Sequence, residues 1–181
     1  MRGRKLGSAS RDQRTDAPRW QATLLNVAGF QLGWFGCVLL GAWAGGAIAL
    51  AVVVAHLRWL ARPGEWRWLL GFLLLGVVID GSLATLGGYR FDPQSPSLGP
   101  LALWLLWLWP LFATLIHHSL EWLWARPWLA ALGGLIGGPS SYLGGAALAG
   151  VELADWLLPA QALIWTSLCL AIGLGLRRRP G

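Results

Sequence analysis

The side chains that could do chemistry are few, and several of them lie together in an apolar run. Residues 112–122, FATLIHHSLEW, hold His117, His118 and Glu121 among leucine and tryptophan. With Thr114 they fall at i, i+3, i+4 and i+7, which predicts one shared face of a helix. Charged groups are costly in an apolar medium, so this face is expected to point into the protein or into a wet cavity. The i,i+4 pair of His117 and Glu121 suits a proton relay, half of a metal site or a plain intrahelical contact.

Asp80 is the strongest single signal of the sequence, because it lies in the apolar stretch VVIDGSLATLGG. A lone carboxylate in such a helix needs a hydrogen-bonding or charged partner. It therefore acts either in proton exchange or as a structural group bonded to a serine or a histidine. His56 stands beside Arg58, and we expect it to be solvated at the cytosolic surface.

A third candidate region is GGPSSY, residues 137–142, where Pro139 is expected to bend or interrupt its helix. Broken helices at membrane depth often line ligand sites, although a packing kink is the simpler interpretation. At about 1.5 Å per residue, the polar groups of four segments reach depths at which they could share one central or cytosol-facing cavity. The candidate polar cluster comprises Asp80, His117, His118, Glu121, Ser140, Tyr142, Asn26 and Gln31.

Several chemistries lack their motifs in this chain. HExxH, which an intramembrane zinc protease would need, is absent, and so are nucleotide-binding glycine loops. Cys37 and Cys169 lie in distant apolar runs without CxxC spacing, so we expect two buried, unpaired thiols. We therefore expect no metal and no cofactor.

The elements that position these residues are predicted to be membrane helices. The chain has 181 residues, of which 56% are apolar and only 12% charged, with a mean hydropathy of +0.55 and 14 tryptophans. A soluble protein of this composition would expose too much apolar surface. The net charge of +6 does not indicate nucleic-acid binding, because the basic residues flank the apolar runs as membrane anchors do.

Six apolar segments approach the roughly 20 residues that span a bilayer. The first two are joined near Gly41, and we expect two helices there rather than one. The predicted fold is an all-α, polytopic bundle in residues 20–176, between a disordered basic tail at 1–19 and a basic C-terminus at 177–181. The six helices are expected at about 20–40, 43–60, 67–87, 100–124, 128–149 and 156–176.

The charge distribution supports this count. With both termini in the cytosol, thirteen of the fourteen basic residues fall on the cytosolic side and only Arg90 falls outside.

Pairs of small residues predict close helix packing. These pairs are Gly29/Gly33, Gly41/Gly45, Gly133/Gly137 and Gly134/Gly138.

Four stretches resemble a bacterial inner-membrane family known as domain of unknown function 2878. They are NVAGFQLGWFGCVLLGA, LLLGVVIDGSLATLGGYRF, LWLLWLWPLFATLIHHSLEWL and ALGGLIGGPSSYLGG, and the resemblance covers about residues 24–176. The matching residues are Asn26, Phe30, Gly33, Trp34, Cys37, Asp80, Gly81, Phe91, Trp107, His118, Ser119, Gly137, Gly138, Pro139 and Tyr142. The family has no established activity. Its genes often lie near those of fatty-acyl-modifying methyltransferases and flavin oxidases, which implies a link to membrane lipid modification.

Three functions follow as hypotheses. We favour an accessory protein of the bacterial inner membrane that acts in lipid modification or envelope stress, with membrane lipids and lipid-modifying enzymes as partners. The alternatives are an intramembrane enzyme that uses Asp80 with the face of His117, His118 and Glu121, and a small proton-coupled permease. Nucleic acid is not an expected partner, and the oligomeric state is not predicted.

Reporter fusions test the predicted topology. Fusions after Gly41, Ser95 and Gly150 should report the outside, and fusions after Arg62, Arg126 and Arg179 should report the cytosol, because the basic residues concentrate on one side. A cytosolic signal at Ser95 would contradict the arrangement of six crossings.

Overall fold

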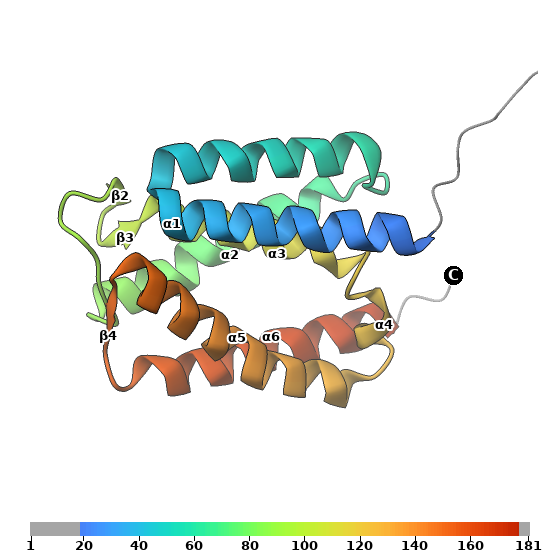
Figure 1. The fold of residues 1–181 in the computed structure, drawn as a ribbon. Helices are drawn as coiled ribbons and strands as arrows, with labels where there is room; N and C mark the ends of the chain where they lie inside the picture. The colour runs from blue at the N-terminus through green and yellow to red at the C-terminus, as the bar shows by residue number, and fades with distance from the viewer. Residues whose placement is uncertain (1–18, 178–181) are drawn as a thin grey trace, which may run out of the picture.

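The computed structural model describes residues 19–177 and is mainly helical (Figure 1). Apart from Arg19 and Arg177, the predicted tails at 1–19 and 177–181 lie outside the described residues. The elements are α1 (Arg19–Trp59), α2 (Trp66–Thr85), β1 (Tyr89–Arg90), β2 (Ser97–Leu98), β3 (Leu101–Ala102), α3 (Leu103–Ile116), α4 (Glu121–Trp124), α5 (Pro127–Ala149), β4 (Glu152–Leu153) and α6 (Leu157–Arg177).

The helices have the length and composition of membrane-spanning segments. Within residues 19–177, three helices are long and apolar enough to cross a membrane, namely Trp20–Trp59, Trp66–Thr85 and Leu157–Arg177. The predicted class of a mainly helical membrane protein is confirmed to this extent. The number of crossings and the side of each terminus stay predictions.

The first helix is broken at Gly41, as the sequence predicts. Gly41 has φ 73° and ψ −160°, a conformation open almost only to glycine. The halves on either side of it run antiparallel (Figure 1). They lie so close that a Cβ on Gly45 would stand 2.3 Å from the carbonyl oxygen of Gly36. The segment therefore forms a hairpin of two helices.

The helices form two layers (Figure 1). The α1 hairpin and α2 pack against α3, while α5 and α6 pack against each other. Most of α3 is buried, with Trp109, Leu111 and Ile116 almost fully enclosed. Two short antiparallel strand pairs lie in the loops: β1 pairs with β4, and β2 pairs with β3. The first pair joins the layers at one end and brings exposed Arg90 within 3.2 Å of Glu152.

The helix predicted at 100–124 is wrong in its second half. The observed helix α3 ends at Ile116, and a turn at 117–120 precedes α4. The backbone groups that would continue it have other partners. The amide of Leu120 donates to the carbonyl of Leu115, and the Trp124 indole donates to the carbonyl of Ile116. These bonds satisfy the end of the helix without another turn.

Pro139 does not interrupt its helix. It lies inside α5, which is assigned as one helix of 23 residues from Pro127 to Ala149. Of the two expected effects, the interruption is therefore wrong, because one missing amide donor does not break this helix, and the bend stays a prediction.

The contact between α5 and α6 depends on two glycines. A Cβ on Gly134 would lie 2.3 Å from the carbonyl oxygen of Trp165, and one on Gly138 would lie 2.4 Å from its side chain. The predicted close packing at Gly134 and Gly138 is confirmed. Gly133 and Gly137 differ, because a Cβ on Gly137 would meet no atom within 4 Å.

This difference predicts opposite effects of the same substitution on one helix. Gly134→Ala should lower the free energy of unfolding by about 1–3 kcal/mol, because the methyl group meets backbone that cannot move aside. Gly137→Ala should be neutral or stabilising, since alanine favours the helix. Thermal unfolding of the two variants in detergent measures the effect. Equal melting temperatures for the two variants would contradict a close contact between Gly134 and α6.

Candidate functional site

The first polar network surrounds Asp80, which is fully buried in α2. Trp109 Nε1 donates a hydrogen bond to Oδ2 at 2.7 Å, and Tyr89 Oη donates to Oδ1 at 2.8 Å. Tyr142 Oη lies 2.8 Å from Oδ2, and Gln161 Nε2 donates to Oδ1 at 3.1 Å. The expected partner was a serine or a histidine, and this is wrong. Donors from β1, α3, α5 and α6 compensate the carboxylate for its lost water.

A large groove runs beside this network, between α1 and α3 on one side and α5 and α6 on the other. Its volume is about 610 Å³. Tyr89, Trp109 and Tyr142 of the Asp80 network form part of its wall. Most of the lining is aromatic or aliphatic, and its polar side chains include Gln31, Ser140 and Ser141. Other lining residues include Phe30, Trp34, Trp104, Leu108, Phe112 and Trp165, together with Gly133 and Gly137.

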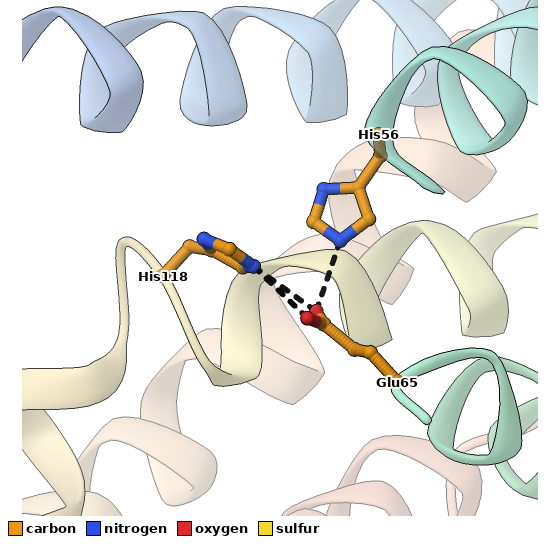
Figure 2. Close-up of side chains that lie close together, drawn as sticks. All are labelled: His56, Glu65 and His118. Carbon is orange, nitrogen blue, oxygen red and sulfur yellow. Dashed lines mark hydrogen bonds and ion pairs between the residues drawn. The ribbon is translucent and has the colours of Figure 1, made fainter. Parts of the chain in front are cut away.

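The second polar network joins His56, Glu65 and His118 (Figure 2). Nε2 of His56 lies 2.9 Å from Oε1 of Glu65, and Nε2 of His118 lies 3.1 Å from the same oxygen. The two imidazole rings are nearly perpendicular, with 4.8 Å between their centres. His56 is only 3% exposed, so its expected position at the solvated surface is wrong.

Glu65 is held in place from its own turn. It occupies the N-cap position of α2 without a side-chain capping bond, and its Oε2 accepts the backbone amide of Arg62 at 2.8 Å. Burial alone would raise the pKa of Glu65. The hydrogen bonds to His118, His56 and the Arg62 amide outweigh burial and hold the pKa well below its usual range. Glu65 is therefore a carboxylate at neutral pH.

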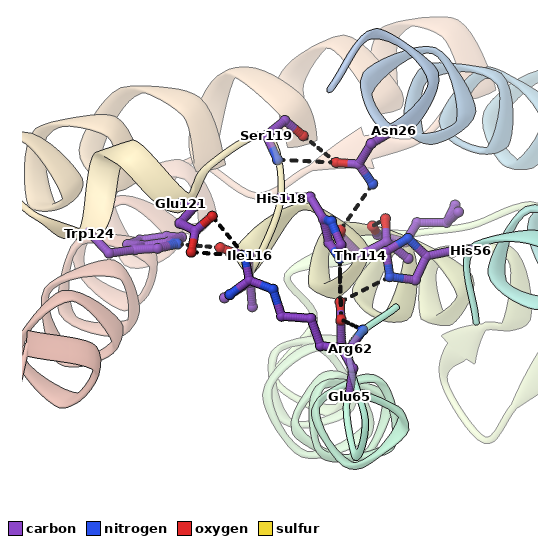
Figure 3. Close-up of polar contacts among 11 residues, drawn as sticks. Asn26, His56, Arg62, Glu65, Thr114, Ile116, His118, Ser119, Glu121 and Trp124 are labelled. Atoms are coloured by element: carbon purple, nitrogen blue, oxygen red, sulfur yellow. Dashed lines mark hydrogen bonds and ion pairs between the residues drawn. The ribbon is translucent and has the colours of Figure 1, made fainter. Parts of the chain in front are cut away.

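Asn26 positions the turn that carries His118 (Figure 3). Its Nδ2 donates to the carbonyl of Thr114 at 3.0 Å, and its Oδ1 accepts the Ser119 amide at 3.3 Å. The Ser119 hydroxyl also donates to Oδ1. These bonds connect buried Asn26 of α1 to both sides of the end of α3. They therefore fix the residues that flank His118.

The predicted polar face of His117, His118 and Glu121 does not exist, because the helix ends before these residues. His117 is half-buried, with its ring 5.1 Å from that of Trp68. Glu121 is exposed and accepts two hydrogen bonds from Arg62, at 2.8 and 2.9 Å. Only His118 of the three joins a buried network.

The candidate cluster is thus divided rather than gathered in one cavity. Tyr142 bonds to Asp80, while Asn26 supports the turn of His118. Gln31 and Ser140 line the groove, and Glu121 and His117 belong to the surface and the turn. The expected buried thiols are confirmed, since Cys37 and Cys169 are both free and buried.

Sequence reasoning missed His56 and Glu65. Glu65 lies in the polar stretch ARPGEW, which is typical of a solvated turn. For His56 the sequence held a signal: it follows Ala49 of the apolar run by seven residues, which places both on one face of the helix, and the structure buries both. Tyr142 was among the predicted cluster, but nothing in the sequence joined it to Asp80, because it lies 62 residues away, and Trp109 and Gln161 lie 29 and 81 residues away.

Comparison with known proteins identifies a family. No curated protein and no solved structure matches the chain. The family described as "Protein of unknown function (DUF2878)" matches residues 23–171. This match covers most of the chain and agrees with the resemblance found in the sequence. The chain therefore belongs to the DUF2878 family of proteins of unknown function.

Proposed function

We propose that this protein holds the hydrocarbon chain of a membrane lipid in the groove between its two layers. In this role it is an accessory protein of lipid modification in the bacterial inner membrane. It presents the lipid to modifying enzymes and is not itself the catalyst. The groove of about 610 Å³ is the observation that carries this proposal.

The size and lining of the groove suit an apolar ligand. Ligand pockets usually have about 300–1,000 Å³ and apolar walls with a few polar groups. Here Phe30, Trp104 and Phe112 contribute aromatic wall, and Ser140 and Ser141 contribute hydroxyls. Trp34 Nε1 donates to Ser141 Oγ at 3.0 Å, so this hydroxyl is already engaged. A polar solute would lose its hydration in this groove and find few partners.

Hydrocarbon is also the medium that surrounds these helices. Lipid tails are as apolar as leucine, so a chain that moves from the bilayer into the groove loses no favourable surroundings. The exposed glycines at 133 and 137 leave room for it on the face of α5. A lipid chain is therefore the occupant that the position and the chemistry of the groove favour.

The alternatives have less support. The proposed enzyme combined Asp80 with the histidine face, but Asp80 is 0% exposed and bonded to four donors. A proton-coupled permease would also need this carboxylate to reach water. Among residues 19–177, no carboxylate lines the groove that either function could use.

We further propose that the chain crosses the membrane six times and that both termini lie in the cytosol. Two contacts support this topology, because they bring together, at one end of the molecule, the turns that contain basic residues. Arg62 of the α1–α2 turn binds Glu121 of α4. A Cβ on Gly173 of α6 would lie 3.3 Å from Pro127, which follows Arg126. At the other end, Arg90 pairs with Glu152.

A matched pair of glycine substitutions tests the groove. A Cβ on Gly137 or on Gly71 meets no atom within 4 Å, but only Gly137 lines the groove. Gly137→Phe should reduce the lipid that co-purifies with the protein about tenfold, which corresponds to about 1.4 kcal/mol of binding free energy. Gly71→Phe should retain lipid as the wild type does. Mass spectrometry of lipids extracted from detergent-washed protein measures both.

The fold of each variant is checked by its melting temperature. Wild-type protein without bound lipid, or Gly137→Phe with a full amount, would contradict the proposal. In cells, deletion of the gene should change the modification of acyl chains, and Gly71→Phe but not Gly137→Phe should restore it. Unchanged acyl chains in the deletion strain would contradict the accessory role.

A further inference from the structure

Three side chains from distant segments bring metal-ligating atoms together outside the groove lining. His56 comes from the end of α1, Glu65 from the start of α2 and His118 from the turn after α3. One ligand atom from each lies within 4.8 Å of the other two. Figure 2 shows both imidazole rings directing Nε2 at the Glu65 carboxylate.

We propose that His56, Glu65 and His118 form a binding site for a divalent transition-metal ion of the zinc type. Two imidazole nitrogens and one carboxylate oxygen are a ligand set that Zn²⁺ accepts readily. Ca²⁺ and Mg²⁺ prefer all-oxygen sites and fit this set poorly. The inference does not depend on the lipid groove.

The distances are close to those of a metal site. Bonds of about 2.0–2.2 Å in a tetrahedral arrangement place ligand atoms about 3.4 Å apart. The observed nitrogen–oxygen separations are 2.9 to 3.2 Å. In the hydrogen-bonded arrangement a proton on each Nε2 points at the carboxylate. A metal ion would take the position between the three ligand atoms, which lie within 4.8 Å of one another, after each nitrogen–oxygen pair separates by a few tenths of an ångström.

The charges around Glu65 also favour a cation. The carboxylate is only 1% exposed, and among the described residues no arginine or lysine side chain pairs with it. Arg62 is the nearest in sequence, but it gives Glu65 only its backbone amide and turns its guanidinium to Glu121. A buried carboxylate is stabilised by a paired charge. A divalent ion shared with the two imidazoles would provide that charge.

Supporting contacts of the kind that metal sites use hold Glu65 and the turn of His118, whereas the buried Nδ1 of His56 has no hydrogen-bond partner among the described residues. The Arg62 amide orients the Glu65 carboxylate. Asn26 binds the backbone and hydroxyl of Ser119, the residue after His118. The side chain of His118 is 14% exposed, against 3% for His56. Three ligands therefore leave a fourth position, on the His118 side, for water or another oxygen ligand.

Zinc titration of the full-length protein tests the site. The protein carries a tag without histidine, is purified in detergent and is stripped with a chelator. Zn²⁺ is then titrated against a competing chelating dye, and Co²⁺ replaces it for visible absorption spectra. We expect one bound ion per chain and a visible absorption spectrum typical of Co²⁺ with a low coordination number. His118→Gln should weaken binding by at least about 100-fold, because supporting residues alone contribute 10–100-fold.

His117→Gln is the matched control, because it changes the neighbouring histidine of the same turn and should bind Zn²⁺ as the wild type does. Zn²⁺ should raise the melting temperature of the wild type and of His117→Gln, since a ligand of the native state stabilises it. It should not raise that of His118→Gln or Glu65→Gln. If Glu65→Gln does not fold, the zinc titrations of the wild type and of His118→Gln still test the proposed site.

Wild-type protein that binds neither Zn²⁺ nor Co²⁺ would overturn the proposal. So would His118→Gln with wild-type affinity. Either result would show that the three residues form a metal-free hydrogen-bonded contact.

Discussion

A carboxylate buried in an apolar helix has to be surrounded by hydrogen-bond donors, and in this protein those donors come from most of the fold. Asp80 of α2 accepts a hydrogen bond from the indole of Trp109, which lies in the same layer. Tyr142 and Gln161 reach it from α5 and α6 of the other layer. Because Asp80 is 0% exposed, losing any of these donors leaves one of its buried oxygens with fewer hydrogen bonds. The network thus holds the two layers in one relative position.

The same arrangement accounts for the groove. The layers are joined at the Asp80 network, through the β1–β4 pair and near α4, and between these contacts the wall of α5 carries glycines instead of large side chains. The groove is lined by four glycines of α5, namely Gly133, Gly134, Gly137 and Gly138, and two of them, Gly134 and Gly138, also allow Trp165 of α6 to approach. The glycines of this helix therefore allow close packing against α6 and also leave room for a ligand.

Composition and local chemistry predicted much of the fold. The apolar content predicted the membrane class, and a glycine between two apolar runs predicted the break at Gly41. The resemblance predicted the family. The candidate site was predicted less well, because it depends on contacts between distant segments. Helical periodicity grouped His118 with His117 and Glu121, but Asn26 and Trp124 bind the backbone where that helix ends. We expected His56 to be solvated because it is close to Arg58 in the sequence, but the packing of the α1 hairpin buries it. Glu65, 53 residues from His118, could be joined to it only by the tertiary fold.

The unfolding of Asp80→Asn in detergent tests the central role of this network most directly. Asparagine keeps the size of the side chain but replaces one acceptor oxygen with an NH₂ group that faces donors. We expect a loss of stability on the order of 1–3 kcal/mol for each donor left unpaired. Glu152→Gln changes an exposed carboxylate that pairs with Arg90, and its free energy of unfolding should stay within about 0.5 kcal/mol of the wild type. An Asp80→Asn protein that unfolds at the wild-type temperature would contradict the claim that this carboxylate holds the layers together.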